Sequence, residues 1–136
     1  AWSAAMAGYL AQAGVSEAAI AVGPGPASSV QDELARCSGC PLLAISLSGP
    51  LPLAVYAFGI QQGKTRILWM VNRTERPQLV VVEKLRKAAA LPMSRLNAAT
   101  LPLKGFAESL ATTSRAGSLD LTMEPYEVCR LALDAR

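Results

Sequence analysis

The chain has 136 residues, a formal net charge of +3 and 51% hydrophobic residues. This length and composition fit one domain, or one small domain with part of another, and exclude long disorder. Histidine is absent, which excludes serine–histidine and cysteine–histidine catalysis within this chain and removes the commonest metal ligand. Because position 1 is Ala rather than Met, we expect the chain to be processed or cut from a longer one.

The first forty residues predict an α/β unit. A helix is expected over residues 1–13, where apolar side chains recur at three- and four-residue spacing, with Gly14 ending it. Residues 15–22 are short and apolar, as in a buried strand, and run into a Gly-Pro-Gly-Pro loop. A second helix is expected over residues 28–37. A helix–strand–loop–helix order is typical of a parallel-sheet unit.

Three cysteines allow several interpretations. Cys37 and Cys40 form a CxxC pair at the end of the second expected helix, and Cys129 lies far away in the sequence. A zinc site needs four ligands, and three sulfurs without His do not supply them. The pair can be two ordinary thiols, which we favour, a local disulfide, or part of a metal site. The odd number of cysteines favours a reducing compartment.

A stretch of 27 residues between Arg36 and Lys64 carries no charge. It is long enough to span a bilayer, but Pro50 and Pro52 interrupt it and would break a helix. We therefore expect no membrane-spanning helix, and two short buried elements joined by a turn. Residues 42–48 fit a helix or a strand, and we favour a helix.

The second half of the chain predicts an antiparallel β-domain. Short apolar runs alternate with turn signals, which is typical of a sandwich or a small barrel. In residues 65–72, Ile67, Trp69 and Val71 share one face and Leu68 and Met70 the other. Residues 101–117 have the composition of a loop. The expected strands cover residues 53–60, 65–72, 78–84, 93–100, 118–122 and 126–133.

Positive charge is concentrated in this second half. Residues 1–62 contain one basic and three acidic residues, whereas residues 63–136 contain twelve basic and seven acidic ones. Lys84, Arg86 and Lys87 form a short basic run. We interpret the run as a solvated edge and expect no nucleic-acid partner, because aromatic residues are not interleaved with the basic residues.

Two stretches carry a resemblance to a known family. "RILWMVNRTERPQLVVV", residues 66–82, resembles a sandwich hairpin whose strand ends on Asn-x-Thr, and "GSLDLTMEPYEVCRLAL", residues 117–133, is similar to a closing strand. "SEAAIAVGPG", residues 16–25, would match the eighth strand of a barrel. The chain thus resembles the C-terminal part of the (β/α)8-barrel glycoside hydrolases that include heparanase-like β-glucuronidases and α-arabinofuranosidases.

The resemblance implies a mainly β fold, in which an antiparallel β-sandwich follows a helix–strand–helix remnant of a barrel. Residues 1–48 would be the terminal α/β piece and residues 49–136 the sandwich domain. The strand that contains the three valines 80–82 would be buried on both sides. Asn72-Arg-Thr74 would be a structural turn rather than a glycosylation site, and Tyr126 an anchor in the core.

The resemblance supplies no catalytic residue. Retaining glycosidases need two carboxyl groups about 5–5.5 Å apart, and the family's catalytic strands precede the residues present here. The one loop that would reach an active site, Gly23–Pro26, has no acid, base or nucleophile. Glu17 would lie at the other end of its strand, in solvent. We assign no catalytic, cofactor-binding or metal-binding residues.

The expected function is that of an accessory domain that stabilises a barrel and has no activity alone. Its partner would be the barrel of the parent protein or a second chain, because one barrel strand without sheet neighbours leaves unpaired backbone groups. The alternative is a free-standing β-sandwich that binds carbohydrate or protein. The apolar surroundings of Trp69 disfavour this alternative, since carbohydrate modules display exposed aromatic side chains. A membrane partner is not expected.

Overall fold

The computed structural model describes residues 1–15, 26–50, 53–100 and 105–133. Two helices precede eight strands. The helices are α1 (Trp2–Gln12) and α2 (Pro26–Ala35), and the strands are β1 (Leu42–Leu43), β2 (Val55–Gln62), β3 (Thr65–Asn72), β4 (Gln78–Val82), β5 (Ala90–Leu96), β6 (Ala107–Thr112), β7 (Leu119–Met123) and β8 (Val128–Ala132). The expected strand over residues 15–22, the loop Gly23–Pro26 and Glu17 fall almost wholly outside the described residues.

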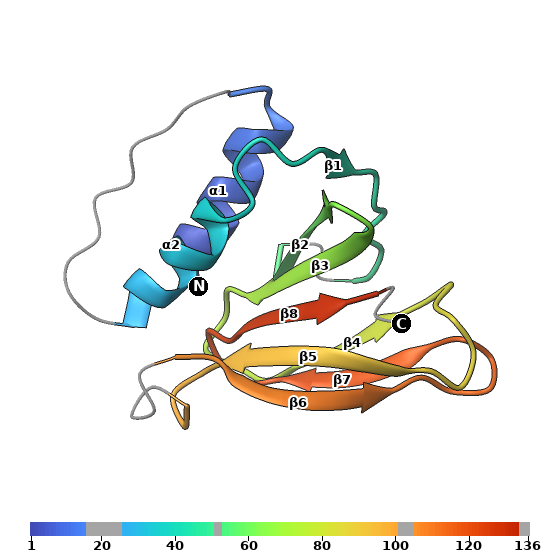
Figure 1. Cartoon of the computed structure of the whole chain (residues 1–136). Coiled ribbons are helices and arrows are strands. Elements are labelled where there is room, and N and C mark those ends of the chain that lie inside the picture. The colour runs from blue at the N-terminus through green and yellow to red at the C-terminus, as the bar shows by residue number, and fades with distance from the viewer. Residues whose placement is uncertain (16–25, 51–52, 101–104, 134–136) are drawn as a thin grey trace.

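The strands form two antiparallel sheets. Six strands pair in the order β1-β2-β3-β8-β5-β6, and β4 pairs with β7 in a second sheet. The two helices lie on one face of the large sheet, and the β4–β7 sheet lies on the other (Figure 1). The prediction of a mainly β antiparallel sandwich is therefore confirmed.

Strand β3 lies at the centre of these layers and explains the apolar pattern of residues 65–72. Ile67, Trp69 and Val71 belong to the core cluster under the helices. Leu68 and Met70 belong to the cluster under the β4–β7 sheet. The two-sided pattern predicted from the sequence is confirmed, because neighbouring side chains of a strand point to opposite faces.

The N-terminal helix ends where the sequence predicts. Gly14 has φ +79°, a conformation that glycine adopts readily. Its N–H donates to the carbonyl of Ala11 at 3.1 Å, and the N–H of Val15 donates to Leu10 at 3.0 Å. These two bonds form a Schellman cap, which satisfies carbonyl groups at the end of the helix.

Both helices share a core with the large sheet. Tyr9 of α1 stacks on Tyr56 of β2 with ring centroids 4.0 Å apart. The hydroxyl of Tyr56 also donates to Oε1 of Gln12 at 2.8 Å. Ala4 and Ala5 of α1 are almost fully buried against this face. The division of the chain near residue 48 stays a prediction.

Strand β4 corrects the interpretation of the three valines. Val81 is 50% exposed and its neighbour Leu79 is 72% exposed, so the strand is not buried on both sides. Val80 and Val82 face the core. A two-stranded outer sheet has only one face against the core, whereas strands of the large sheet such as β3 are buried on both faces.

Two other segments differ from the sequence predictions. Residues 42–48 do not form a helix: Leu42 and Leu43 pair with Ile60 and Gly59 of β2, and residues 44–48 have no regular structure. The helix expected over residues 28–37 instead begins at Pro26, whose fixed φ suits the first turn, and ends at Ala35.

Strands β5 and β6 also differ from what the sequence predicts. Strand β5 ends at Leu96 rather than at Thr100, because Oδ1 of Asn97 accepts the N–H groups of Ala99 and Thr100 and forms a turn. Residues 107–112 form a strand although their sequence predicts a loop. This strand pairs only with β5 and is largely exposed, so it lacks an apolar pattern.

Neither described helix has the length and hydropathy needed to cross a membrane.

Candidate functional site

The turn after β3 is organised around Asn72, whose side chain is fully buried. Its Oδ1 accepts the N–H of Thr74 at 2.9 Å and the hydroxyl of Thr74 at 2.8 Å. Its Nδ2 donates to the carbonyls of Arg76 at 2.8 Å and Glu124 at 2.9 Å. The structural turn predicted for Asn72 and Thr74 is confirmed, and a buried amide engaged in this way is not accessible to a glycosylating enzyme.

A second turn, residues 123–127, lies against the first. The N–H of Asn72 donates to the carbonyl of Glu127 at 2.9 Å, and the N–H of Tyr126 donates to that of Thr74 at 3.2 Å. The turn is closed by the N–H of Glu127, which donates to the carbonyl of Glu124 at 3.1 Å. The two sequence stretches that carry the family resemblance therefore form one hydrogen-bonded unit.

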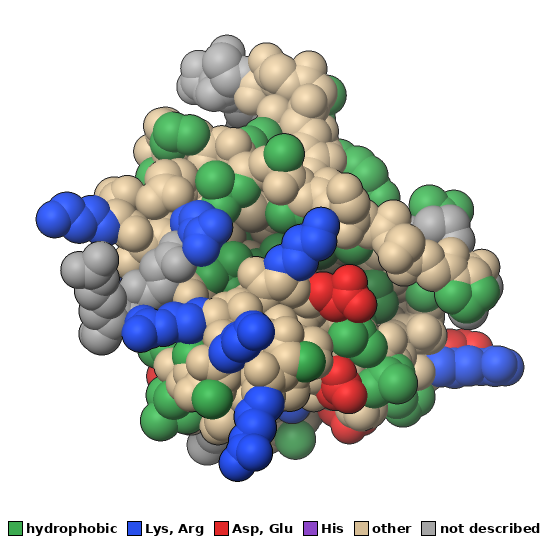
Figure 2. Space-filling view, turned by 90° about the vertical axis from the view of Figure 1, so that its right-hand side faces the viewer, with side chains coloured by type: hydrophobic (Ala, Val, Ile, Leu, Met, Phe, Trp, Pro, Cys, Tyr) green, Lys and Arg blue, Asp and Glu red, His purple; other side chains and the backbone are tan. Residues whose placement is uncertain are grey.

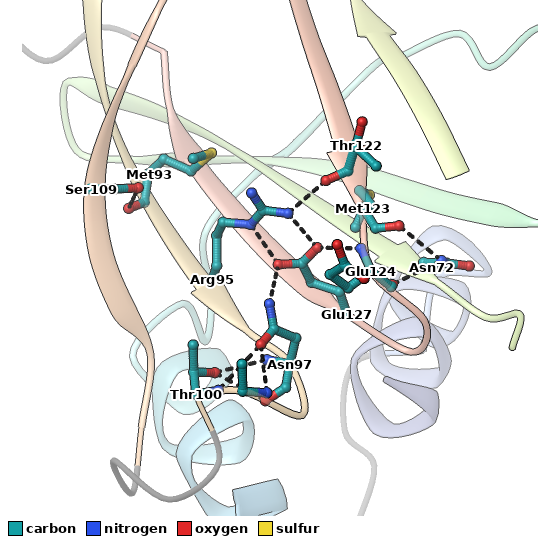
Figure 3. A network of polar contacts seen from close by, with 11 residues as sticks. Asn72, Met93, Arg95, Asn97, Thr100, Ser109, Thr122, Met123, Glu124 and Glu127 are labelled. Carbon is teal, nitrogen blue, oxygen red and sulfur yellow. Dashed lines mark hydrogen bonds and ion pairs between the residues drawn. The ribbon is translucent and has the colours of Figure 1, made fainter. Parts of the chain in front are cut away.

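Glu127 places a carboxylate inside this unit with no exposed surface. Arg95 of β5 binds this carboxylate through two nitrogens: Nε lies 2.5 Å from Oε1, and Nη2 lies 2.6 Å from Oε2. Nδ2 of Asn97 donates to Oε1 at 3.0 Å, and the N–H of Glu124 donates to Oε2 at 2.7 Å (Figure 3). The hydrogen bond to Glu127 is the main cause that raises the pKa of Arg95. We call Asn72, Arg95, Asn97 and Glu127 the polar corner.

An open depression of about 690 Å³ lies beside the polar corner. Its polar side chains come from β5, β7 and the turns that follow these two strands. They include the carboxylates of Asp120 and Glu124, both exposed. The depression is lined by Arg95, Asn97, Ala98, Ala99, Asp120, Leu121, Thr122, Glu124 and Pro125.

The carboxylate of the polar corner is fully engaged by neighbouring groups of the domain. Both carboxylate oxygens of Glu127 are engaged by a guanidinium, an amide and a backbone N–H, and the residue has no exposed surface. A general acid or base has to reach the substrate directly or through one water. The described residues also contain no group of three or more side chains placed to hold a metal ion.

The three cysteines are free thiols. Cys37 and Cys40 are half-buried at the end of α2, and burial is the main cause that raises the pKa of Cys37. Cys129 is buried in β8, where burial raises the pKa of its thiol to about 12. The structure thus shows no disulfide among the three cysteines, and their interpretation as ordinary thiols stays a prediction.

Two aromatic residues behave differently. Trp69 is fully buried, as its apolar surroundings predict, and it offers no surface to a carbohydrate. Tyr126 is 50% exposed, so its prediction as a core anchor is wrong. It occupies a tight-turn position with φ +55°, which directs the side chain outward, and Glu127 takes the inward position instead.

The pairing of Arg95 with Glu127 was missed in the sequence. Arg95 stands within β5, in the sequence "MSRL", and Glu127 stands just before β8, in "YEVC". A charged residue at an inward position needs a partner of opposite charge, and this was the available signal. The sequence does not state which of the twelve basic residues of the second half would be that partner.

Known proteins resemble this chain in fold. A GH30 endoxylanase from Clostridium papyrosolvens C71 superposes with a TM-score of 0.55 at 8% identity, over 72% of this chain and 24% of its own. The catalytic domain of GH30 xylanase C from Talaromyces cellulolyticus gives 0.56 at 8% identity, over 72% and 21%. The chain thus spans about a quarter or less of these structures, and the predicted resemblance to the C-terminal part of glycoside hydrolases is confirmed as a likeness of fold.

No curated protein matches the sequence. A family model does match, over residues 52–131, and its description is the C-terminal immunoglobulin-like domain of D-apionate lactonase. The matched segment begins before β2 and ends in β8, so it contains the polar corner and the strands of both sheets except β1. This chain belongs to the family of D-apionate lactonase C-terminal immunoglobulin-like domains.

Proposed function

We propose that the chain is an accessory, non-catalytic β-sandwich that stabilises the catalytic domain of a hydrolase acting on sugars or sugar lactones. The observation that carries the proposal is the family match over residues 52–131, because that family is defined as the C-terminal domain of a lactonase. This chain covers 24% and 21% of the two xylanases of similar fold, so most of each xylanase lies outside the part that resembles this chain. Their chemistry would therefore belong to residues outside the sandwich.

The internal chemistry of the sandwich supports the same proposal. Its buried carboxylate, Glu127, is held by Arg95 and Asn97 in a way that leaves no oxygen for a substrate. The sequence also contains no His. A polar network whose members satisfy one another makes this part of the domain rigid.

The first experiment measures the intact mass of the natural gene product from its source. A product of several hundred residues that ends with this sequence is expected. That product should hydrolyse a sugar lactone or a xylan-type glycan, while the 136-residue chain alone should hydrolyse neither. Turnover by the chain alone would overturn the non-catalytic role, and a natural product of about 136 residues would overturn the assignment to a larger hydrolase.

A second measurement tests the stabilising role in the same natural product. Arg95→Met weakens the sandwich at a position inside its own fold. If the sandwich supports the catalytic domain, the half-life of the activity at raised temperature should fall while the initial rate stays the same. An unchanged half-life in a product whose sandwich has melted would contradict the proposal.

A further inference from the structure

One end of the sandwich carries an unbalanced group of positive charges. It is formed by two loops, residues 83–89 between β4 and β5 and residues 113–118 between β6 and β7 (Figure 1). Figure 2 looks onto this side of the molecule and shows Lys and Arg side chains gathered over it, with fewer carboxylates. We call this surface the basic end; its four cations are Lys84, Arg86, Lys87 and Arg115, all exposed, and the two loops carry one carboxylate, the exposed Glu83.

The two loops are fastened to each other. The N–H of Leu85 donates to the carbonyl of Gly117 at 2.8 Å, and the hydroxyl of Thr113 donates to that of Arg86 at 2.6 Å. A Cβ at Gly117 would lie 2.5 Å from the oxygen of Leu85, so the backbones approach as closely as glycine allows. The four cations are therefore carried by two loops that are hydrogen-bonded to each other.

The four cations lack internal partners. Within the described residues, none of them forms an ion pair, whereas Arg36, Arg95 and Arg130 each bind a carboxylate. Like charges held on one frame repel one another unless an anion sits between them. The basic end is therefore suited to an anionic ligand.

A hydroxyl-rich depression adjoins the basic end. It measures about 270 Å³ and is lined by Thr112, Ser114, Ser118, Leu119 and Asp120. The hydroxyl oxygens of Ser114 and Ser118 lie 2.9 Å apart, and Ser114 belongs to the same loop as Arg115. Ser114 Oγ already accepts the N–H groups of Ala116 at 3.2 Å and Ser118 at 3.1 Å. The hydroxyl of Ser118 and the carboxylate of Asp120 are the groups that can bind a sugar hydroxyl, because each still offers an acceptor to an O–H donor.

From this combination we infer that the basic end binds an acidic polysaccharide, with uronate carboxylates on the cations and sugar hydroxyls at Ser118 and Asp120. A nucleic acid fits less well. Neither loop contains an aromatic residue on which a base could stack.

The test uses the 136-residue chain and a galacturonate oligosaccharide, with a neutral galactan oligosaccharide of the same length and a DNA duplex for comparison. Calorimetric titration should show binding of the galacturonate only, weakened by added salt. The double variant R86Q/R115Q should bind at least about fivefold more weakly, since exposed charge contacts contribute modestly each.

Arg76→Gln is the matched control. Arg76 is exposed, its side chain forms no ion pair within the described residues, and it lies at the opposite end of β4. Its loss should leave the affinity unchanged. If R76Q weakened galacturonate binding as much as R86Q/R115Q does, the effect would reflect only the overall charge of the chain, and the inference would be overturned. An absence of galacturonate binding would overturn it as well.

Asp120→Asn tests the proposed contact with a sugar hydroxyl, and the DNA duplex tests the kind of polyanion. Removing this carboxylate should weaken galacturonate binding, because a strong acceptor for sugar hydroxyls is lost. Tighter binding of the DNA duplex than of galacturonate by the unaltered chain would overturn the inference in favour of a nucleic-acid surface. Because these side chains are exposed, the variants should keep the melting temperature of the parent chain, and failure of this test leaves the accessory role untouched.

Discussion

At the scale of single residues, Asn72 joins the two turns of the polar corner. Its amide donates to carbonyls on both turns while its oxygen caps Thr74. Asn72→Ala should lower the free energy of unfolding by about 1–3 kcal/mol, because buried carbonyls lose their donor. Urea denaturation measures the change.

Asn72→Asp gives the sharper comparison. The aspartate keeps the oxygen that caps Thr74 but presents a carboxylate to the carbonyls of Arg76 and Glu124. It should be at least as unstable as the alanine variant. If it were as stable as the parent chain, the bond that Oδ1 accepts from Thr74 would account for the stability of this turn. The bonds from Nδ2 to the carbonyls of the two turns would then contribute little.

Arg95 and Arg130 offer a matched pair of salt bridges. Both arginine side chains are 28% exposed, but the partner of Arg95 is fully buried whereas Glu33, the partner of Arg130, is 21% exposed. Arg95→Met should cost about 3–5 kcal/mol, since it leaves a buried charge unpaired. Arg130→Met should cost about 1 kcal/mol or less. Equal losses in chemical denaturation would contradict the structural role of Glu127.

Cys129 gives stability a dependence on alkaline pH. Burial raises the pKa of its thiol from 9.0 to about 12 in the folded state. Between these values the unfolded chain has lost the proton and the folded chain keeps it, so rising pH favours unfolding, by at most about 1.4 kcal/mol per pH unit. Cys129→Ala should remove this part of the slope. Identical slopes for both proteins from pH 9 upward would show that the thiol does not contribute.

At the scale of elements, the contact of α1 with the sheet depends on Gly8. A Cβ there would lie 2.5 Å from Cδ1 of Phe58 and 2.6 Å from Cε1 of Tyr56. Alanine favours a helix over glycine by about 1 kcal/mol, but overpacking costs about 1–3 kcal/mol. We expect Gly8→Ala to lower the melting temperature.

Gly105→Ala is its control, because among the described residues nothing lies within 4 Å of an added Cβ. It should leave the melting temperature unchanged. A Gly8→Ala variant that melts at or above the parent temperature would mean that α1 shifts away from the sheet without loss.

Elements with a strong periodic pattern were predicted well, and those without one were not. Strand β3 alternates between two apolar faces, and its faces follow from the sequence alone. Strand β6 is an exposed edge strand, so only its pairing with β5 defines it. Residues 42–43 become a strand because β2 offers them an edge. Such tertiary pairing overrides local preference and is not encoded in a short segment.

The polar corner was only partly predictable for the same reason. Local hydrogen bonds within the turn at Asn72 and Thr74 follow from the types of residue and their spacing. The pairing of Arg95 with Glu127 spans 32 positions and depends on how β5 and β8 come together. The exposure of Tyr126 follows from this pairing, because the inward position is taken by Glu127.

At the scale of the whole molecule, the helices and the sandwich share a core. A chain that starts at residue 42 would expose the helix-facing side of the large sheet, including Tyr56, Phe58 and Trp69. An apolar surface of this kind binds hydrophobic dyes and promotes association. We expect this shortened chain to bind such a dye and to melt without a cooperative transition.

Differential scanning calorimetry on the shortened chain also tests the predicted boundary near residue 48. A cooperative transition within a few degrees of that of the full chain would mean that residues 42–136 form a domain that folds without the helices. The expected broad, low-enthalpy transition would mean that the helices complete the fold.

The position of β8 has a consequence for how the chain folds during synthesis. In the large sheet β8 lies between β3 and β5, although it is the last strand in the sequence. The ribosome must therefore release residue 132 before the centre of the sheet can close, and until then β3 and β5 expose unpaired edges. Contacts between segments so far apart in sequence slow folding, so the nascent chain stays exposed to aggregation and proteolysis until β8 has left the ribosome.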